Sequence, residues 1–155
     1  MTLIALRTVG REISAAAAAA PMPPQLPDSI AFAVSYGGMG AEGGDMIWRG
    51  KVEGDVPGQV TIRVEYAGSP AGRRQAIWPV NAWLFFSADD LRNSFAAELS
   101  GRMHWGTGEM RVTGLVSDGV RVDTPIEQRM HLLQPELEGR ATIRLYPRLA
   151  TAGQP

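Results

Sequence analysis

The sequence predicts an all-β fold: a single antiparallel, up-and-down, calycin-like barrel of eight strands with an N-terminal helical or extended arm. Turn-forming residues are abundant, with 18 glycines and 11 prolines among 155 residues. After residue 28 they separate short runs in which apolar and polar residues alternate, as in strands with one buried face. A two-sheet sandwich shares this alternation. Short connections favour the barrel, as do the glycines inside the runs, Gly50, Gly101 and Gly114, which suit a strongly bent sheet.

The first 27 residues differ in composition from the rest and form the predicted arm. Apolar residues at a rough helical spacing lead into a run of alanines, and a proline-rich linker follows at 21–27. We expect a frayed or helical arm, and its folding over a barrel mouth as a lid is the alternative. The arginines inside its apolar stretch do not suit a signal peptide. The barrel domain is then predicted at 28–147 and a C-terminal tail at 148–155.

The first four strands are predicted from runs that end at turn residues. Glycines within 37–44 follow the first run, and Pro57-Gly58 follows the second. The third run ends at an expected exposed loop that carries Arg73 and Arg74. These strands are predicted at 30–36, 45–53, 59–66 and 77–87.

The last four strands are predicted in the same way, and the tight joints imply antiparallel neighbours. The polar segment 87–93 is expected to form one helical turn before the fifth strand. Gly106-Thr107-Gly108 ends the fifth run, and Asp118-Gly119 is a strong two-residue hairpin signal after the sixth. These strands are predicted at 95–105, 109–116, 120–132 and 138–146.

Alternation gives each predicted strand a dry face and a wet face, because successive side chains point to opposite sides. Where the alternation is clear, the dry face has no Asp, Glu, His, Lys or Arg, and both His104 and His131 fall on the wet face. Acid/base, nucleophilic and metal chemistry need such side chains in a pocket. We therefore expect no metal site and no cofactor.

Aromatic and methionine side chains line the predicted lumen, with few polar groups among them. This pattern indicates either a packed core or a pocket for a mostly apolar small molecule. Tyr66 and Gln128 are the candidate catalytic residues, because each could donate a hydrogen bond to a substrate carbonyl. The candidate substrate-binding residues are Tyr36, Met46, Trp48, Met103, Trp105, Met110, Thr124 and Met130.

The fourth predicted strand is apolar on both faces, so its outer face needs a cover. The N-terminal arm or a second subunit would supply one. We expect a homo-oligomer formed through residues 77–87.

The charge and composition exclude several other partners. A net charge of −1 creates no field that would attract nucleic acid. No apolar run reaches the roughly 18 residues of a membrane span, so we expect none. The absence of cysteine fits a cytoplasmic protein.

Two segments resemble the allene oxide cyclase and dirigent class of eight-stranded barrels. The first runs from Trp48 to Asp55, and the second runs from Gly101 to Gly114 and contains a Gly-Thr-Gly turn. The resemblance implies an eight-stranded barrel that handles apolar, flexible substrates and often forms oligomers. Members include cyclases of oxidised fatty acids, plant proteins that guide phenoxy-radical coupling, and bacterial enzymes that close polyketide rings by pericyclic reaction. The acidic residues of the first two have no counterpart on the predicted dry face, which favours the third.

A pericyclic ring closure needs no proton transfer, because holding the reacting ends of a linear substrate together supplies much of the acceleration. The sequence therefore predicts a cofactor-independent cyclase or isomerase that folds an apolar, polyketide-like substrate in the lumen, as in a pericyclic 4+2 reaction. A non-catalytic carrier of an apolar small molecule and a packed structural module are the alternatives.

Overall fold

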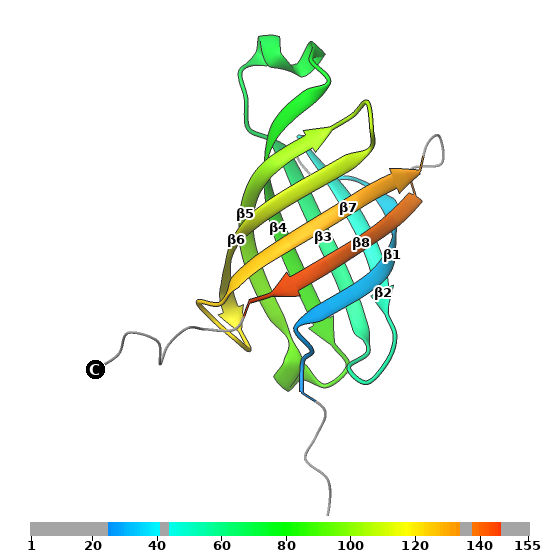
Figure 1. The fold of residues 1–155 in the computed structure, drawn as a ribbon, viewed down its shortest axis with the longest axis vertical. Helices are drawn as coiled ribbons and strands as arrows, with labels where there is room; N and C mark the ends of the chain where they lie inside the picture. Colours follow the sequence, from blue (N-terminus) through cyan, green and yellow to red (C-terminus); the bar gives the residue numbers. More distant parts are fainter. Residues whose placement is uncertain (1–24, 41–43, 134–137, 147–155) are drawn as a thin grey trace, which may run out of the picture.

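The computed structural model describes residues 25–40, 44–133 and 138–146, which form a closed barrel of eight antiparallel strands (Figure 1). Each strand pairs with the next along the chain, and β8 closes the barrel by pairing with β1. The predicted barrel is confirmed; residues 1–24 of the arm and 147–155 of the tail lie outside the described residues. The strands are β1 Ser29–Met39, β2 Asp45–Val52, β3 Gly58–Tyr66, β4 Ile77–Ala88, β5 Phe95–His104, β6 Glu109–Gly119, β7 Pro125–Leu133 and β8 Glu138–Leu145.

The interior of the barrel is the hydrophobic core, filled by every second residue of each strand. Trp48, Ile62 and Leu84 are at most 1% exposed. Gly101 and Gly114 fall at inward positions, and a Cβ at either would collide with a backbone carbonyl oxygen of the neighbouring strand. These glycines therefore let adjacent strands approach where the sheet bends, which is the role the sequence predicts for them.

At the lower end of the barrel, β2 joins β3 and β4 joins β5 (Figure 1). Buried apolar side chains lie at this end. Leu26 and Val56 are 3% and 6% exposed, and Phe86 lies against Phe95 with their ring centroids 5.6 Å apart. Arg121 fixes the segment before β1, because its guanidinium donates to the Leu26 carbonyl and to Asp28, each at 2.7 Å. The described end of the predicted arm is therefore held at this end.

The upper end carries the β3–β4 loop, which stands above the barrel (Figure 1). The loop contains a short 3₁₀ helix, η1 (Pro70–Arg74), which the sequence did not predict. The Tyr66 hydroxyl donates to the Ser69 carbonyl at 2.5 Å, and Trp78 Nε1 donates to the Arg73 carbonyl at 3.0 Å. The loop is thus anchored by the aromatic side chains at its two ends.

The predicted hairpin at Asp118-Gly119 and the predicted start of the seventh strand at residue 120 are wrong. β6 continues through Gly119, and residues 120–124 form the turn to β7. Arg121 and Asp123 adopt positive φ angles of 62° and 67°, a left-handed conformation outside the β region that strand residues other than glycine occupy. Apolar and polar residues alternate at 120–124 as they do in a strand. This alternation carries no information on the backbone φ angle, and so the sequence alone predicts a strand here.

The other predicted boundaries differ by smaller amounts. β1 extends to Met39, with an irregularity between Tyr36 and Gly38, and so takes in glycines predicted to lie in a loop. The helical turn predicted within 87–93 is present as η2 (Leu91–Asn93), where the Asp90 carboxylate accepts the backbone N–H of Arg92 at 3.1 Å.

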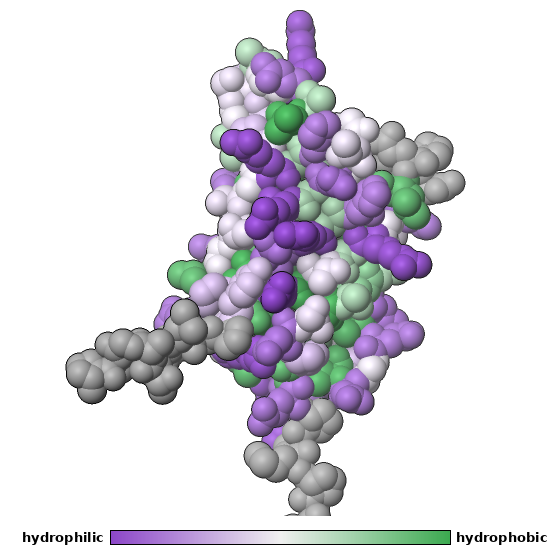
Figure 2. All heavy atoms as spheres, viewed as in Figure 1, coloured by the Kyte–Doolittle hydropathy of each residue, from purple (hydrophilic) through white to green (hydrophobic). Residues whose placement is uncertain are grey.

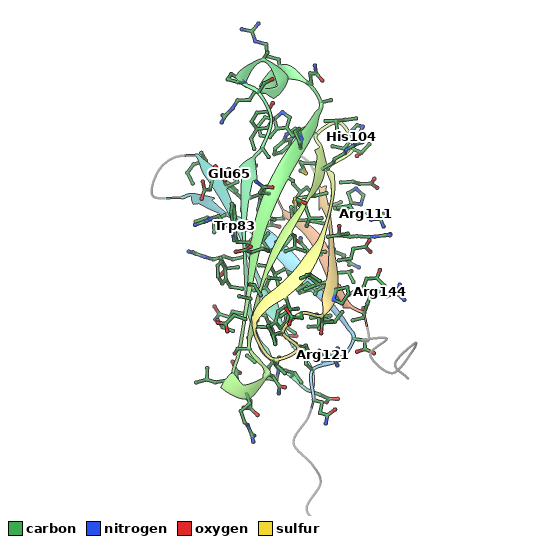
Figure 3. All side chains as sticks on the ribbon, turned by 90° about the vertical axis from the view of Figure 1, so that its left-hand side faces the viewer. Glu65, Trp83, His104, Arg111, Arg121 and Arg144 are labelled. Atoms are coloured by element: carbon green, nitrogen blue, oxygen red, sulfur yellow. The ribbon has the colours of Figure 1, made fainter. Side chains whose placement is uncertain are left out.

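The outer face of β4 is partly exposed in this single chain. Ile77 and Phe85 are 46% and 44% exposed, whereas the Arg63 guanidinium lies 4.3 Å from the centre of the Trp83 ring. Trp83 lies on the opposite side of the barrel from Arg111 (Figure 3). The homo-oligomer expected through this strand stays a prediction.

Candidate functional site

One polar side chain of β7 lies in the middle of the core. Gln128 is 0% exposed, and neither its Oε1 nor its Nε2 has a hydrogen-bond partner among the described residues. Its cross-strand neighbours are Val112 and Ile143. An unpaired buried amide costs about 1–3 kcal/mol, so it calls for an explanation such as a bound water or a ligand. Gln128 is therefore a buried polar group for which the described part of the chain supplies no hydrogen-bond partner.

Three methionines form a row one layer above Gln128, towards the upper end. Met103, Met110 and Met130 are direct cross-strand neighbours on β5, β6 and β7, and each is at most 2% exposed. Trp78 extends the row onto β4. Because methionine is flexible and polarizable, this methionine row is a wall that adapts to different shapes.

Aromatic side chains surround the upper end of the lumen. Trp78 contacts both Trp105 and Tyr66 edge to face, with centroid distances of 5.2 and 4.9 Å. Tyr36 packs in the same manner on Trp48 at 5.1 Å. Tyr36, Trp78 and Trp105 are only partly buried, whereas Phe86 and Phe95 at the lower end are 1% and 4% exposed. The inward-facing aromatic side chains are thus more exposed at the upper end than at the lower end.

The structure brings most of the sequence-predicted lumen residues together, with two exceptions. Tyr66 is at the upper end, but its hydroxyl is occupied by the Ser69 carbonyl. Thr124 is 6% exposed but belongs to the turn before β7, at the lower end. Trp78 was missed, although the inward alternation of β4 could have revealed it. Gln128 and the methionine row lie inside the barrel, and Tyr36, Met46, Trp48 and Trp105 lie nearer its upper end.

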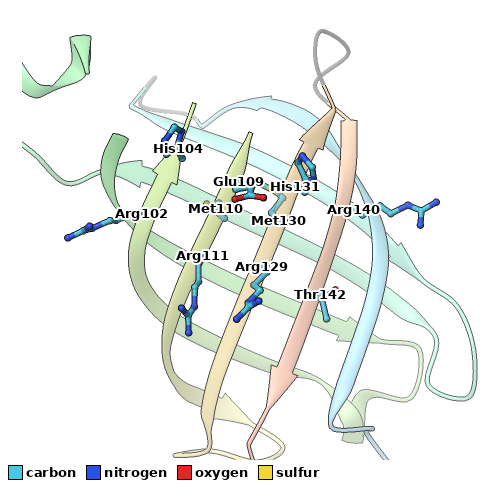
Figure 4. Close-up of a pocket in the computed structure, with 10 residues that line it drawn as sticks. All are labelled: Arg102, His104, Glu109, Met110, Arg111, Arg129, Met130, His131, Arg140 and Thr142. Carbon is cyan, nitrogen blue, oxygen red and sulfur yellow. The ribbon is translucent and has the colours of Figure 1, made fainter. Parts of the chain in front are cut away.

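A hollow, the outer groove, lies on the outside of β5, β6, β7 and β8 and has a volume of about 510 Å³ (Figure 4). Strongly hydrophilic side chains gather on this face (Figure 2). Within it, Arg102, Arg111 and Arg129 are direct cross-strand neighbours and form an arginine row. The groove is lined by Arg102, His104, Glu109, Met110, Arg111, Arg129, Met130, His131, Arg140 and Thr142.

Glu127 lies beneath the arginine row and is 5% exposed. Its carboxylate accepts from Arg111 Nε at 2.7 Å and from Arg129 Nε at 3.0 Å. Burial alone would raise the pKa of Glu127, but the hydrogen bonds and charges of the two arginines outweigh it and lower the pKa from its ordinary value. Glu127 therefore stays ionised and bridges two like charges.

The part of the chain that the structure describes contains no group of three or more His, Cys, Asp or Glu side chains that could hold a metal ion. Likewise, no helix in this part is long and apolar enough to cross a membrane. Comparisons with protein-family models, curated proteins and solved structures found no match.

Proposed function

We propose that this barrel binds a mostly apolar small molecule in its lumen and orients it through the Gln128 carboxamide. The observation that carries the proposal is the fully buried amide without a partner among the described residues. Apolar pockets use a few polar groups to fix a ligand's orientation. The ligand class is therefore a hydrocarbon-rich molecule with one carbonyl, hydroxyl or amide group.

The difference between the two ends of the barrel supports ligand entry at the upper end. Buried apolar side chains lie at the lower end, among them Leu26, Val56 and the Phe86–Phe95 pair. At the upper end, partly buried aromatic side chains lie above the methionine row, and Gln128 lies one layer below that row. A ligand that enters there would displace flexible methionine side chains rather than backbone.

A cofactor-independent ring closure or isomerisation, including the pericyclic 4+2 reaction that the sequence predicts, is the second candidate. The observation that favours it is the composition of the interior. Of the four buried polar residues described, Asn93, Thr124, Glu127 and Gln128, only Glu127 is ionisable, and it pairs with arginines on the outside. A reaction in this lumen would depend on substrate orientation, with the Gln128 amide donating to a substrate carbonyl.

The test measures binding of Nile red, a neutral apolar dye with one carbonyl group, by its fluorescence. We expect saturable binding that Gln128→Leu weakens about tenfold or more, the loss of a bond worth about 1.4 kcal/mol. Gln59→Leu, the same change at an exposed position of β3, should leave binding unchanged.

The same proteins are then incubated with a linear compound that carries a diene and a carbonyl-activated alkene. A product of equal mass that is formed by the protein and lost in Gln128→Leu would support the ring-closing candidate. Absence of Nile red binding, or equal binding by Gln128→Leu, would contradict the proposed function.

A further inference from the structure

We propose that the outer groove binds a small soluble ligand with two phosphate-like anionic groups, at a site separate from the lumen. Apart from Met110 and Met130 of the methionine row, the residues of β6 and β7 that line the groove belong to the outward face of these strands, opposite Gln128. The inference therefore stands without the proposed function. It rests on three observations: the arginine row, the charge balance of the groove, and its shape.

The arginine row places three arginines at directly opposite backbone positions; the Arg111 and Arg129 side chains extend alongside each other, and Arg102 extends away from them (Figure 4). Arg102 pairs with Arg111, and Arg111 pairs with Arg129. The Cβ atoms of such cross-strand neighbours lie about 5 Å apart, and facing like charges destabilise a sheet. A bound anion would relieve this repulsion.

The carboxylates of the groove do not neutralise its arginines. The Glu127 carboxylate already forms ion pairs with Arg111 and Arg129. Neither Arg102 nor Arg140 has a carboxylate oxygen within 4 Å among the residues that the structure describes. Four arginines thus face two glutamates, Glu109 and Glu127, which leaves two positive charges in excess.

A second row runs beside the arginine row and adds further donors. His104, Glu109, His131 and Arg140 are successive cross-strand neighbours on β5, β6, β7 and β8. A hydrogen bond orients the His104 ring, because its Nδ1 accepts the backbone N–H of Thr107 at 3.3 Å. At their backbone positions, the two histidines and Arg140 lie roughly 5 to 10 Å from the arginine row, while the Arg140 side chain extends away from Arg129 (Figure 4).

The shape and chemistry of the groove favour a small ligand. Its volume of about 510 Å³ lies within the range of small-molecule pockets, roughly 300–1,000 Å³. Guanidinium groups form paired hydrogen bonds with phosphate oxygens, which suits arginine to this class of ligand. Two anionic groups could engage the two rows at once, and Glu109 would disfavour a continuous negative surface such as a membrane.

The test is a calorimetric titration of the full chain with inorganic pyrophosphate. We expect binding that weakens with added salt and that falls at least about fivefold in Arg102→Gln and in Arg111→Gln, because each loses charge-assisted bonds. Arg49→Gln, which removes the same charge from the exposed outer face of β2, should change affinity less than twofold, a difference of roughly 0.4 kcal/mol. Circular dichroism checks that each variant is folded.

A variant with the opposite sign makes the test sharper. Glu127→Gln removes a negative charge from beneath the arginine row and should tighten pyrophosphate binding severalfold. Equal weakening by Arg49→Gln and Arg102→Gln would indicate a general charge effect and overturn the proposal. Binding to phosphoinositide-containing vesicles without binding to pyrophosphate would overturn the assignment to a small soluble ligand.

Discussion

Glu127 and Gln128 are consecutive residues of β7, nearly identical in size and both buried, yet they face opposite environments. Glu127 faces outward and is 5% exposed, with two arginines holding its carboxylate. Gln128 faces inward and is 0% exposed, with no hydrogen-bond partner in the described part of the chain. The chain thus supplies partners for the Glu127 carboxylate on the outer side of the barrel wall. On the inner side, the described part of the chain supplies none for the Gln128 carboxamide.

Under the proposed function, this difference separates a structural group, Glu127, from a ligand-binding group, Gln128. A carboxylate that is paired within the chain lowers the free energy of the fold and needs nothing further. An unpaired amide raises it, and such costs are retained at sites where a ligand supplies the missing bond. Substitutions at these two positions should therefore have opposite effects on stability and on binding.

The largest expected effect comes from placing a charge on the inner side. Gln128→Glu keeps the size of the side chain but should lower the free energy of unfolding by roughly 4 kcal/mol at neutral pH, because a buried unpaired carboxyl has its pKa raised by about three units or more. Its folded state prefers the protonated form, so stability should recover as the pH falls towards about 5. Urea unfolding at several pH values measures this; a variant as stable as the parent at neutral pH would show that the interior is wet.

A smaller loss is expected on the outer side. Glu127→Gln leaves Arg111 and Arg129 facing each other and should lower the free energy of unfolding by about 1–3 kcal/mol, the range for hydrogen bonds to charged groups. Glu98→Gln, on the exposed outer face of β5, serves as the matched control and should cost less than about 0.5 kcal/mol. Chemical denaturation compares the three proteins, and equal stability of both variants would show that the buried ion pairs contribute nothing.

Glu127 should also give the parent protein a pH dependence opposite to that of Gln128→Glu. The folded-state pKa of Glu127 is lowered from its ordinary value of 4.5, so its contribution is present above that value and is lost as the pH falls through the folded pKa. Stability measured between about pH 6 and 3 should therefore fall more steeply in the parent than in Glu127→Gln. Parallel curves would contradict this.

The smallest expected effect is a gain in the free energy of unfolding. Gln128→Leu removes the unpaired amide and should raise the free energy of unfolding by about 1–2 kcal/mol, which corresponds to a few degrees in the unfolding temperature. Gln59→Leu should give no gain. A loss of stability in Gln128→Leu would indicate that a structural water satisfies the amide and that the site is not reserved for a ligand.

The sequence predicts the barrel and the inner side of its wall well, because period-two alternation reports directly on which face is buried. It placed Gln128 and the methionine row in the interior without any knowledge of strand pairing. Alternation carries no information on φ, and so the turn at 120–124 was mistaken for strand. Nor does it report hydrogen bonding, which is why the occupied hydroxyl of Tyr66 was taken for a free donor.

The outer groove could not be predicted from the sequence, for a different reason. Alternation places Arg102, Arg111 and Arg129 on the wet face, where isolated charges are ordinary. Their alignment in one row depends on the register of β5, β6 and β7, which the three-dimensional pairing alone defines.

The most direct test of whether Gln128 binds the ligand follows the ¹⁵N-NMR signal of its side-chain amide during addition of Nile red. The signal is assigned by comparison with Gln128→Leu. If the carboxamide is the ligand's hydrogen-bond partner, its proton resonances should shift downfield in proportion to the dye bound. Binding of Nile red that leaves these resonances unchanged would contradict the claim.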